Sequence, residues 1–167
     1  MKYIKLVIII LAPLLLFVGC QGPTFTEPSR PSVKKEVTIA ENYSHQITVK
    51  NKTILVEVVD TDASRAQGLS KRLSLEDVNG MLFDFRNTNI SRPSFWMKDM
   101  NFAIDIIWIA NNRIVGITEN IPPPKNNDVL SDALPTYPAP QDITHVLEVP
   151  SGWSKRYDIV IGDAVKL

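Results

Sequence analysis

Apolar and polar residues alternate from residue 46 onward, and this period of two predicts β-strands. Ile47 and Val49 alternate with Thr48 and Lys50, and residues 53–59 form a second strand after a turn. Short strands at close spacing, with one helix and no regular strand–helix–strand rhythm, predict a mainly β fold, either a sandwich or a barrel. Further strands are predicted at 81–85, 94–97, 103–110, 113–118, 143–149, 159–161 and 164–167.

The segments between these strands carry helix and turn signals. Asp60-Thr61 caps one short helix after the early strand, and apolar residues then recur at helical spacing. Asn111-Asn112 tolerates positive φ and predicts a hairpin, whereas Asn79-Gly80 is expected to reverse the chain. Residues 121–141 contain six prolines and are expected to form a long loop.

The N-terminal segment does not belong to this β pattern. A basic start with Lys2 and Lys5 precedes an apolar run over residues 6–18, which is the order of an export signal. A run of 13 residues is shorter than the roughly 20 that a membrane-spanning helix needs. Cys20 is the only cysteine and follows a small residue, Gly19. We therefore interpret Cys20 as a lipid attachment site rather than a chance cysteine behind an ordinary cleaved signal.

The predicted organisation follows from this interpretation. Residues 1–19 are a lipoprotein signal peptide, residues 20–45 a lipidated flexible tether, and residues 46–167 a single β domain. A short strand over 36–39 is an option within the tether. Each buried methylene contributes roughly 0.8 kcal/mol, so two or three acyl chains such as palmitate would hold the protein on a membrane. The domain is then expected to face the periplasm or the cell exterior.

Charge and thiol content exclude several classes of function. Removal of Lys2 and Lys5 with the signal leaves 16 basic residues against 18 acidic ones, so neither a nucleic-acid partner nor an electrostatic hold on anionic lipid is predicted. Lipidation of Cys20 leaves no thiol, which excludes cysteine catalysis and thiolate metal sites. No cofactor and no metal are predicted. Met81, Met97 and Met100 are candidate copper(I) ligands, but Met81 and Met97 lie in apolar runs, where methionine fills core gaps, and the two histidines are far apart in sequence.

The candidate binding residues of the β domain lie between residues 95 and 105 and at Tyr137 and Glu148. Trp96 and Lys98 share one face of a predicted strand, and Asp105 interrupts an apolar strand. A buried carboxylate needs partners. Asp105 therefore either flanks a pocket with Lys98 and Trp96, or has a structural role, in which it ties down a loop or pairs with Lys98 or an arginine. Tyr137 is expected to be exposed in the proline-rich loop, and Glu148 adds a second carboxylate. The predicted ligand-binding residues are therefore Trp96, Lys98, Asp105, Tyr137 and Glu148.

No catalytic residue is assigned, because the familiar nucleophile, metal and phosphate-loop signatures are missing. A hydrolytic or transfer enzyme would need Asp105 and Glu148 to face one cleft as acid and base. Stacking of the aromatic side chains on sugar rings is an alternative to their packing in the core.

Several short motifs follow one another along the β domain. They are Gly68-Leu69, Gly80-Met81-Leu82-Phe83, Phe95-Trp96-Met97-Lys98, Asp105-Ile106-Ile107, Asn120 through Pro123, Leu147-Glu148 and Gly162-Asp163. Together they resemble the domain of unknown function 192 family, whose bacterial and archaeal members are often exported. The resemblance covers roughly residues 54–167 and implies a compact, jelly-roll-like β fold with no established activity. Ser70 stands where members often have Met, and the loop from Pro124 lacks the cysteines that many of them carry.

The sequence as a whole predicts a lipid-anchored envelope protein whose β domain is a ligand-binding or accessory module. The ligand would be a small molecule, a glycan or an envelope protein. A carboxylate enzyme and a structural scaffold for an envelope partner remain the alternatives.

Replacement of the lipid acceptor tests the anchor. Cys20→Ser should release the protein from the membrane fraction or stop its maturation, because the acyl chains have no other attachment point. Fractionation and mass spectrometry of the product check this. A fully processed variant that stays on the membrane would refute lipidation.

Overall fold

The computed structural model describes residues 43, 45–125 and 133–167, all within a compact unit that spans Val37–Leu167. The predicted signal peptide, Cys20, the optional strand at 36–39 and most of the predicted tether lie outside the described residues. Within the described part, no helix is both long and apolar enough to cross a membrane.

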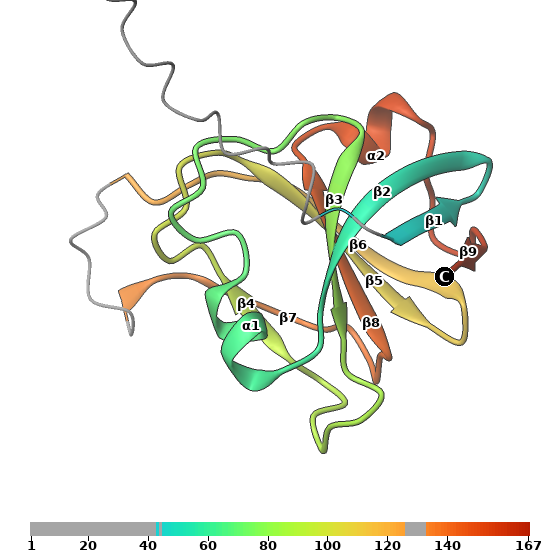
Figure 1. Ribbon diagram of the computed structural model, residues 1–167, viewed down its shortest axis with the longest axis horizontal. Coiled ribbons are helices and arrows are strands. Elements are labelled where there is room, and N and C mark those ends of the chain that lie inside the picture. Colours follow the sequence, from blue (N-terminus) through green and yellow to red (C-terminus); the bar gives the residue numbers. More distant parts are fainter. Residues whose placement is uncertain (1–42, 44, 126–132) are drawn as a thin grey trace, which may run out of the picture. The chain divides into compact units, whose positions relative to one another are not determined.

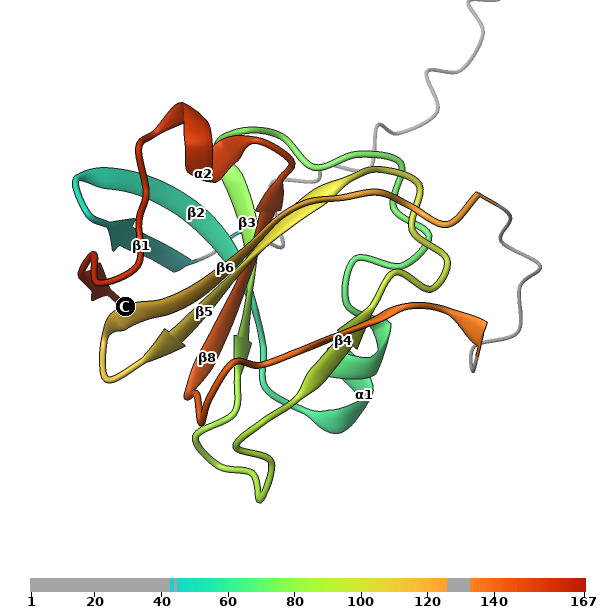
Figure 2. The ribbon, with the colours of Figure 1, turned by 180° about the vertical axis from the view of Figure 1, so that it is seen from behind.

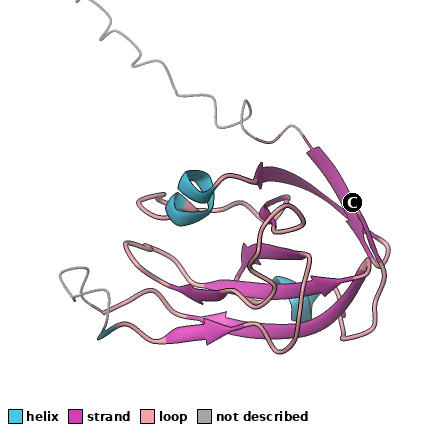
Figure 3. Cartoon of the chain, turned by 90° about the horizontal axis from the view of Figure 1, so that it is seen from below, coloured by secondary structure: helices cyan, strands magenta, loops and turns pink. Residues whose placement is uncertain are grey.

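One seven-stranded sheet, curled into a half-barrel, forms the body of the domain (Figure 1). A two-stranded ribbon, β4 (Ser94–Trp96) with β7 (Thr136–Pro138), and two short helices, α1 (Asp62–Gln67) and α2 (Trp153–Arg156), complete the described part (Figure 3). The predicted mainly β fold, with a short helix after an early strand, is confirmed. In spatial order the large sheet contains β6 (Arg113–Ile121), β5 (Ile104–Ala110), β8 (His145–Pro150), β3 (Asn79–Asp84), β2 (Lys52–Val59), β1 (His45–Val49) and β9 (Val165–Lys166).

The connection from β2 to β3 differs from the prediction. Asn79-Gly80 does not reverse the chain; it begins β3, which runs parallel to β2. A parallel pair needs a crossover of a dozen or more residues, and α1 with residues 68–78 supplies it. The alternating pattern predicts strands but carries no signal for their direction.

Two further segments were predicted incorrectly. Residues 159–161 are not a strand: Ile159 is buried, but the next two residues are exposed and hydrogen bonds close a turn there. The predicted proline-rich loop contains β7, and Tyr137 is partly buried against the core instead of exposed. Pairing with β4 gives this segment a regular structure that its prolines concealed.

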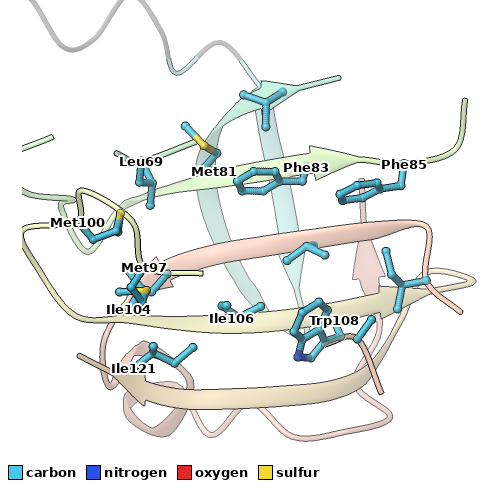
Figure 4. Packing of buried hydrophobic residues seen from close by; sticks show 14 residues of the cluster. Leu69, Met81, Phe83, Phe85, Met97, Met100, Ile104, Ile106, Trp108 and Ile121 are labelled. Carbon is cyan, nitrogen blue, oxygen red and sulfur yellow. The ribbon is translucent and has the colours of Figure 1, made fainter. Parts of the chain in front are cut away.

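One face of the large sheet packs against the β4–β7 ribbon and against Leu69, which follows α1, and we call it the α1 face. Phe95 of β4 lies edge-to-face against Phe83 and Trp108, with ring centroids 4.9 and 5.6 Å apart. The three methionines weighed as copper ligands are buried here among apolar side chains (Figure 4). The buried residues of this core are Val59, Leu69, Met81, Phe83, Phe85, Met97, Met100, Ile104, Ile106, Trp108, Ile121, Ala139, Ile143 and Val146.

The opposite face, which we call the α2 face, packs against α2. Trp153 of α2 and Val165 of β9 are buried on it. Figures 1 and 2 show α2 and β9 at the end of the domain away from α1 and the ribbon. Strand residues alternate between the two faces, as the pleat requires; Val149 and Ile107 belong to the α2 face, whereas their neighbours Glu148 and Ile106 belong to the α1 face.

Asp105 of β5 is fully buried and joins three segments of the chain. Its carboxylate accepts hydrogen bonds from the backbone N–H groups of Asn120, Gly152 and Ser154, at 2.9, 3.1 and 3.0 Å. Gly152 precedes α2, so Asp105 caps this helix from a distant strand and also holds the end of β6. Of the two roles considered for Asp105, the structure assigns it the structural one.

Removal of this carboxylate should destabilise the fold. Asp105→Ala removes the acceptor of three backbone N–H groups, of which that of Ser154 is buried and those of Asn120 and Gly152 are partly buried. An unsatisfied buried group costs about 1–3 kcal/mol, so the free energy of unfolding should fall by about 2 kcal/mol or more. Urea unfolding of the purified protein measures this. Asp142→Ala is the control, because Asp142 is 75% exposed in its ion pair with Arg92 and its loss should change stability by less than about 1 kcal/mol. Equal effects of the two substitutions would contradict this role.

Candidate functional site

A pocket of about 490 Å³ opens on the α1 face, between α1 and β4. Its floor contains Phe83 of β3 and Glu148 of β8, and its walls come from α1, from residues 68–70 and from residues 90–96. Apolar atoms provide most of its surface, which is typical of ligand sites that also carry a few placed polar groups.

Local sequence signals place the α1 wall. Thr61 and Ser64 form a reciprocal capping box, in which each hydroxyl accepts the backbone N–H of the other residue at 3.1 Å. Gly68 ends the helix at φ 47°, a conformation that favours glycine. A Cβ at Gly68 would also lie 3.4 Å from the Phe83 ring. The helix therefore stops after six residues, and the chain passes directly into the pocket wall.

Aromatic side chains form the β4 side of the pocket. Phe95 turns into the core, where its ring also contacts Phe85 at a centroid distance of 6.3 Å. Trp96 lines the pocket as well and remains 46% exposed. The two other tryptophans of the chain, Trp108 and Trp153, are buried, so Trp96 is the tryptophan within reach of a ligand.

Glu148 is the polar group at the floor. The register places it between Met81 of β3 and Ile106 of β5, on the central strand of the sheet, and it is only 5% exposed. Its carboxyl makes no hydrogen bond or ion pair with any described residue. Burial raises the pKa of Glu148 to about 8, and the positive charge of Arg72 opposes this shift only in part. At neutral pH the group is mainly a protonated carboxylic acid.

The other charged residues of the pocket are paired. Arg65 binds Asp62 at 2.6 Å and donates to the backbone oxygen of Asp84 at 2.8 Å. Arg92 binds Asp142 at 2.9 Å. Outside the lining, Arg72 forms an ion pair with Glu57 at 2.7 Å, in the row of the sheet that also contains Glu148. Among the charged lining residues, Glu148 alone has no partner in the described part of the chain.

The structure brings two of the five predicted binding residues together. Trp96 and Glu148 line the same pocket. Lys98 does not line it, and the backbone oxygen of this residue accepts a hydrogen bond from the Ser70 hydroxyl at 2.9 Å. Tyr137 pairs with Phe95 in the ribbon and packs against the core.

Asp105 and Glu148 do not share a cleft. Asp105 lies opposite Val149, the neighbour of Glu148, so the two carboxylates point to opposite faces of the sheet. His145 lies outside the pocket lining too: its ring is 3.0 Å from the Thr144 hydroxyl and 3.6 Å from Asp84, and burial lowers its pKa. No cluster of three or more His, Cys, Asp or Glu that could bind a metal occurs among the described residues.

Sequence reasoning missed the α1 side of the pocket. Arg65, Gln67 and Ser70 line it. Arg65 and Gln67 are polar residues on a short helix, which is typical of a solvated face, and the position of Ser70, where similar proteins often have Met, does not indicate a pocket. Arg92 was missed too, because it lies in a loop before β4, where a charged residue is ordinary. Its neighbour Pro93 indicates a loop in the sequence, but gives no sign that this loop forms a wall of the pocket.

Comparisons with known proteins agree with this fold. Residues 45–167 match the family DUF192, described as "Uncharacterized ACR, COG1430". A protein of unknown function from Novosphingobium aromaticivorans DSM 12444 is similar in structure, with a TM-score of 0.62 and 29% identity over 73% of this chain and 84% of that chain. A putative transcription regulator from Sinorhizobium meliloti 1021 has a TM-score of 0.62 and 27% identity, over 72% of this chain and 91% of that chain. No curated protein matches the chain.

The raised pKa of Glu148 predicts how stability depends on pH. The unfolded carboxyl has a pKa near 4.5 and the folded one about 8, so between these values the folded state binds more protons and loses stability as pH rises. Glu148→Gln stays neutral, and its melting temperature should exceed that of the natural protein by about 3 °C or more at pH 8.5 and by much less at pH 5.

The control for this comparison is Glu119→Gln on β6, where the glutamate is exposed. Its difference from the natural protein should stay constant across the same pH range. A Glu148→Gln difference that does not grow with pH would contradict a buried, protonated Glu148.

Proposed function

This chain belongs to the DUF192 family, and we propose that its pocket on the α1 face binds a ligand through a basic group, an amine or a guanidine. The proposal rests on one observation: Glu148 is buried at the floor of the pocket without a partner, whereas the other charged lining residues are paired. A buried carboxyl that no protein group satisfies is expensive to keep. A ligand cation would supply the missing partner.

The aromatic residues support a cationic ligand. Phe83, Phe95 and Trp96 line the pocket around this carboxyl, and the faces of aromatic rings attract cations. The pocket lining already contains such a contact, since the Arg65 guanidinium lies 5.3 Å from the centre of the Phe85 ring. The ion pairs of Arg65 with Asp62 and of Arg92 with Asp142 reduce the repulsion that these arginines would exert on an entering cation.

Binding is supported better than two-carboxylate catalysis. A glycosidase-like or transfer reaction by Asp105 and Glu148 needs both groups in one cleft. Asp105 is fully buried on the α2 face, and three backbone N–H groups occupy its carboxylate. The carboxylate pair on which the enzyme hypothesis was built is therefore not assembled.

We also propose that this domain acts at the surface of a membrane in the cell envelope, tethered by the lipidated Cys20. The support is the N-terminal sequence, with its basic start, its apolar run of 13 residues and its single cysteine. A domain anchored in this way would bind its ligand outside the cytoplasm.

A lysine derivative tests the pocket. Nα-acetyl-lysine N-methylamide should bind, and its dissociation constant should fall about tenfold per pH unit between pH 6 and 8, because Glu148 must lose its proton to pair with the ammonium. The amine itself stays charged over this range, since its pKa is about 10.4. Titrations followed by protein NMR measure the affinity at each pH.

Two matched comparisons make this test decisive. The Nε-acetylated derivative lacks the charge and should bind at least about tenfold more weakly at pH 8. Glu148→Gln should remove the pH dependence for the amine, whereas Glu119→Gln should retain it. Equal binding of the charged and neutral derivatives, or an affinity that declines as pH rises, would overturn the assignment of a basic ligand.

A further inference from the structure

The outer edge of β4 is unpaired in the described part of the chain. The small sheet contains only β4 and β7, and the register joins Ser94 to Pro138, Phe95 to Tyr137 and Trp96 to Thr136. The backbone of β4 therefore has one edge against β7 and one edge without a strand. Ser94, Phe95 and Trp96 all line the pocket, so the free edge borders it.

The register also shows where the backbone groups of β4 point. Residue pairs in an antiparallel ribbon alternate between hydrogen-bonded and non-hydrogen-bonded types. The N–H of Ala139 donates to the oxygen of Pro93 at 2.9 Å, which marks the Pro93–Ala139 pair as hydrogen-bonded. Phe95–Tyr137 is then hydrogen-bonded too, and the Ser94 and Trp96 pairs are not.

Pro138 gives independent support for this alternation. Proline has no N–H to donate, and it lies opposite Ser94 at a position that needs no donor. The N–H and C=O groups of Ser94 and Trp96 consequently point away from β7, toward the free edge. Two donors and two acceptors, spaced two residues apart, form the pattern that an added strand uses.

We propose that this edge accepts an extended peptide segment of a partner protein, which adds a strand to the β4–β7 ribbon and places a lysine or arginine side chain in the pocket. The proposal rests on the proposed function, whose basic group it assigns to a side chain. A peptide residue opposite Phe95 points to the same side of the ribbon as Phe95 does. Phe95 points to the α1 face of the large sheet, where Glu148 lies.

The geometry divides affinity and specificity between two parts of the site. Hydrogen bonds from Ser94 and Trp96 involve only the peptide backbone and accept many sequences. The carboxyl of Glu148 and the aromatic wall select one basic side chain. A free edge strand without a partner is a template for aggregation, and Trp96 on β4 is an exposed large apolar side chain, with 46% of its surface open to solvent.

A pentapeptide of alternating design provides the probe. Acetyl-Thr-Val-Lys-Val-Thr-amide should bind the natural protein at least about tenfold more tightly than Nα-acetyl-lysine N-methylamide at pH 8, because its backbone adds hydrogen bonds at the free edge. Methylation of the backbone nitrogen of both valines should abolish this gain. Hydrogen exchange of the Ser94 and Trp96 amides should slow when the unmethylated peptide binds.

A substitution on the protein side tests the same bonds. Ser94→Pro removes an outward N–H while sparing the bonds of β4 to β7, and proline is tolerated at a strand edge. It should reduce the tenfold gain of the pentapeptide to about twofold. The methylated peptide keeps the test valid even where Ser94→Pro disturbs the ribbon, since it is measured on the natural protein.

The outcomes separate the two proposals. Where the lysine derivative binds as expected but the pentapeptide binds no better and N-methylation has no effect, strand addition is wrong and the basic-group pocket stands. Where a pentapeptide with norleucine in place of lysine protects the Ser94 and Trp96 amides equally well, strand addition stands and the basic-group assignment falls. Where neither probe binds, both are wrong.

Discussion

The hydrogen bonds of one buried carboxylate hold three separate segments of this fold together. Asp105 accepts the N–H groups of Asn120, Gly152 and Ser154, so β5, the end of β6 and the start of α2 meet at a single side chain. A carboxylate can be buried without great penalty when several N–H groups surround it. The adjacent row of the sheet contains Glu148, which is also buried but receives none of this compensation. The paired strands β5 and β8 therefore contain two buried acids in different situations: Asp105 is held by hydrogen bonds, whereas Glu148 has no partner among the described residues.

This contrast explains why the pocket lies where it does. On the α2 face, Asp105 uses its bonds to close the packing between the sheet and α2. On the α1 face, α1 and β4 stand apart over the floor at Glu148, and the gap stays open. The early end of α1 at Gly68 and the turn of Phe95 into the core keep the two walls separate. An apolar residue of similar volume at this position would stabilise the fold more than Glu148 does, so the buried acid is better explained by an interaction outside the chain.

Much of the fold follows from the alternation of apolar residues, but the site follows only in part. Trp96 and Glu148 could be predicted, because Trp96 shares a predicted strand face with a charged residue and Glu148 is a carboxylate within an apolar strand. The same reasoning wrongly assigned Asp105 to the pocket. The sequence does not show which of these two carboxylates, on neighbouring strands, receives hydrogen bonds from N–H groups. That distinction depends on α2 and β6, which reach Asp105 from 15 to 49 residues away. The sequence also did not predict that β3 runs parallel to β2, or that residues 136–138 form the strand β7. Both features depend on pairing with segments that are distant in sequence.

The ribbon of β4 and β7 connects the fold to its proposed partner. Proline at position 138 costs the ribbon nothing, because the register gives this residue no hydrogen bond to make with Ser94. The same register leaves the Ser94 and Trp96 backbone groups facing outward, beside an acid that lacks a cation. Neither feature is sufficient alone, since free edges occur in many sheets and a raised pKa marks function only statistically. Their meeting in one pocket is the stronger constraint, because one extended chain with one basic side chain satisfies both at once.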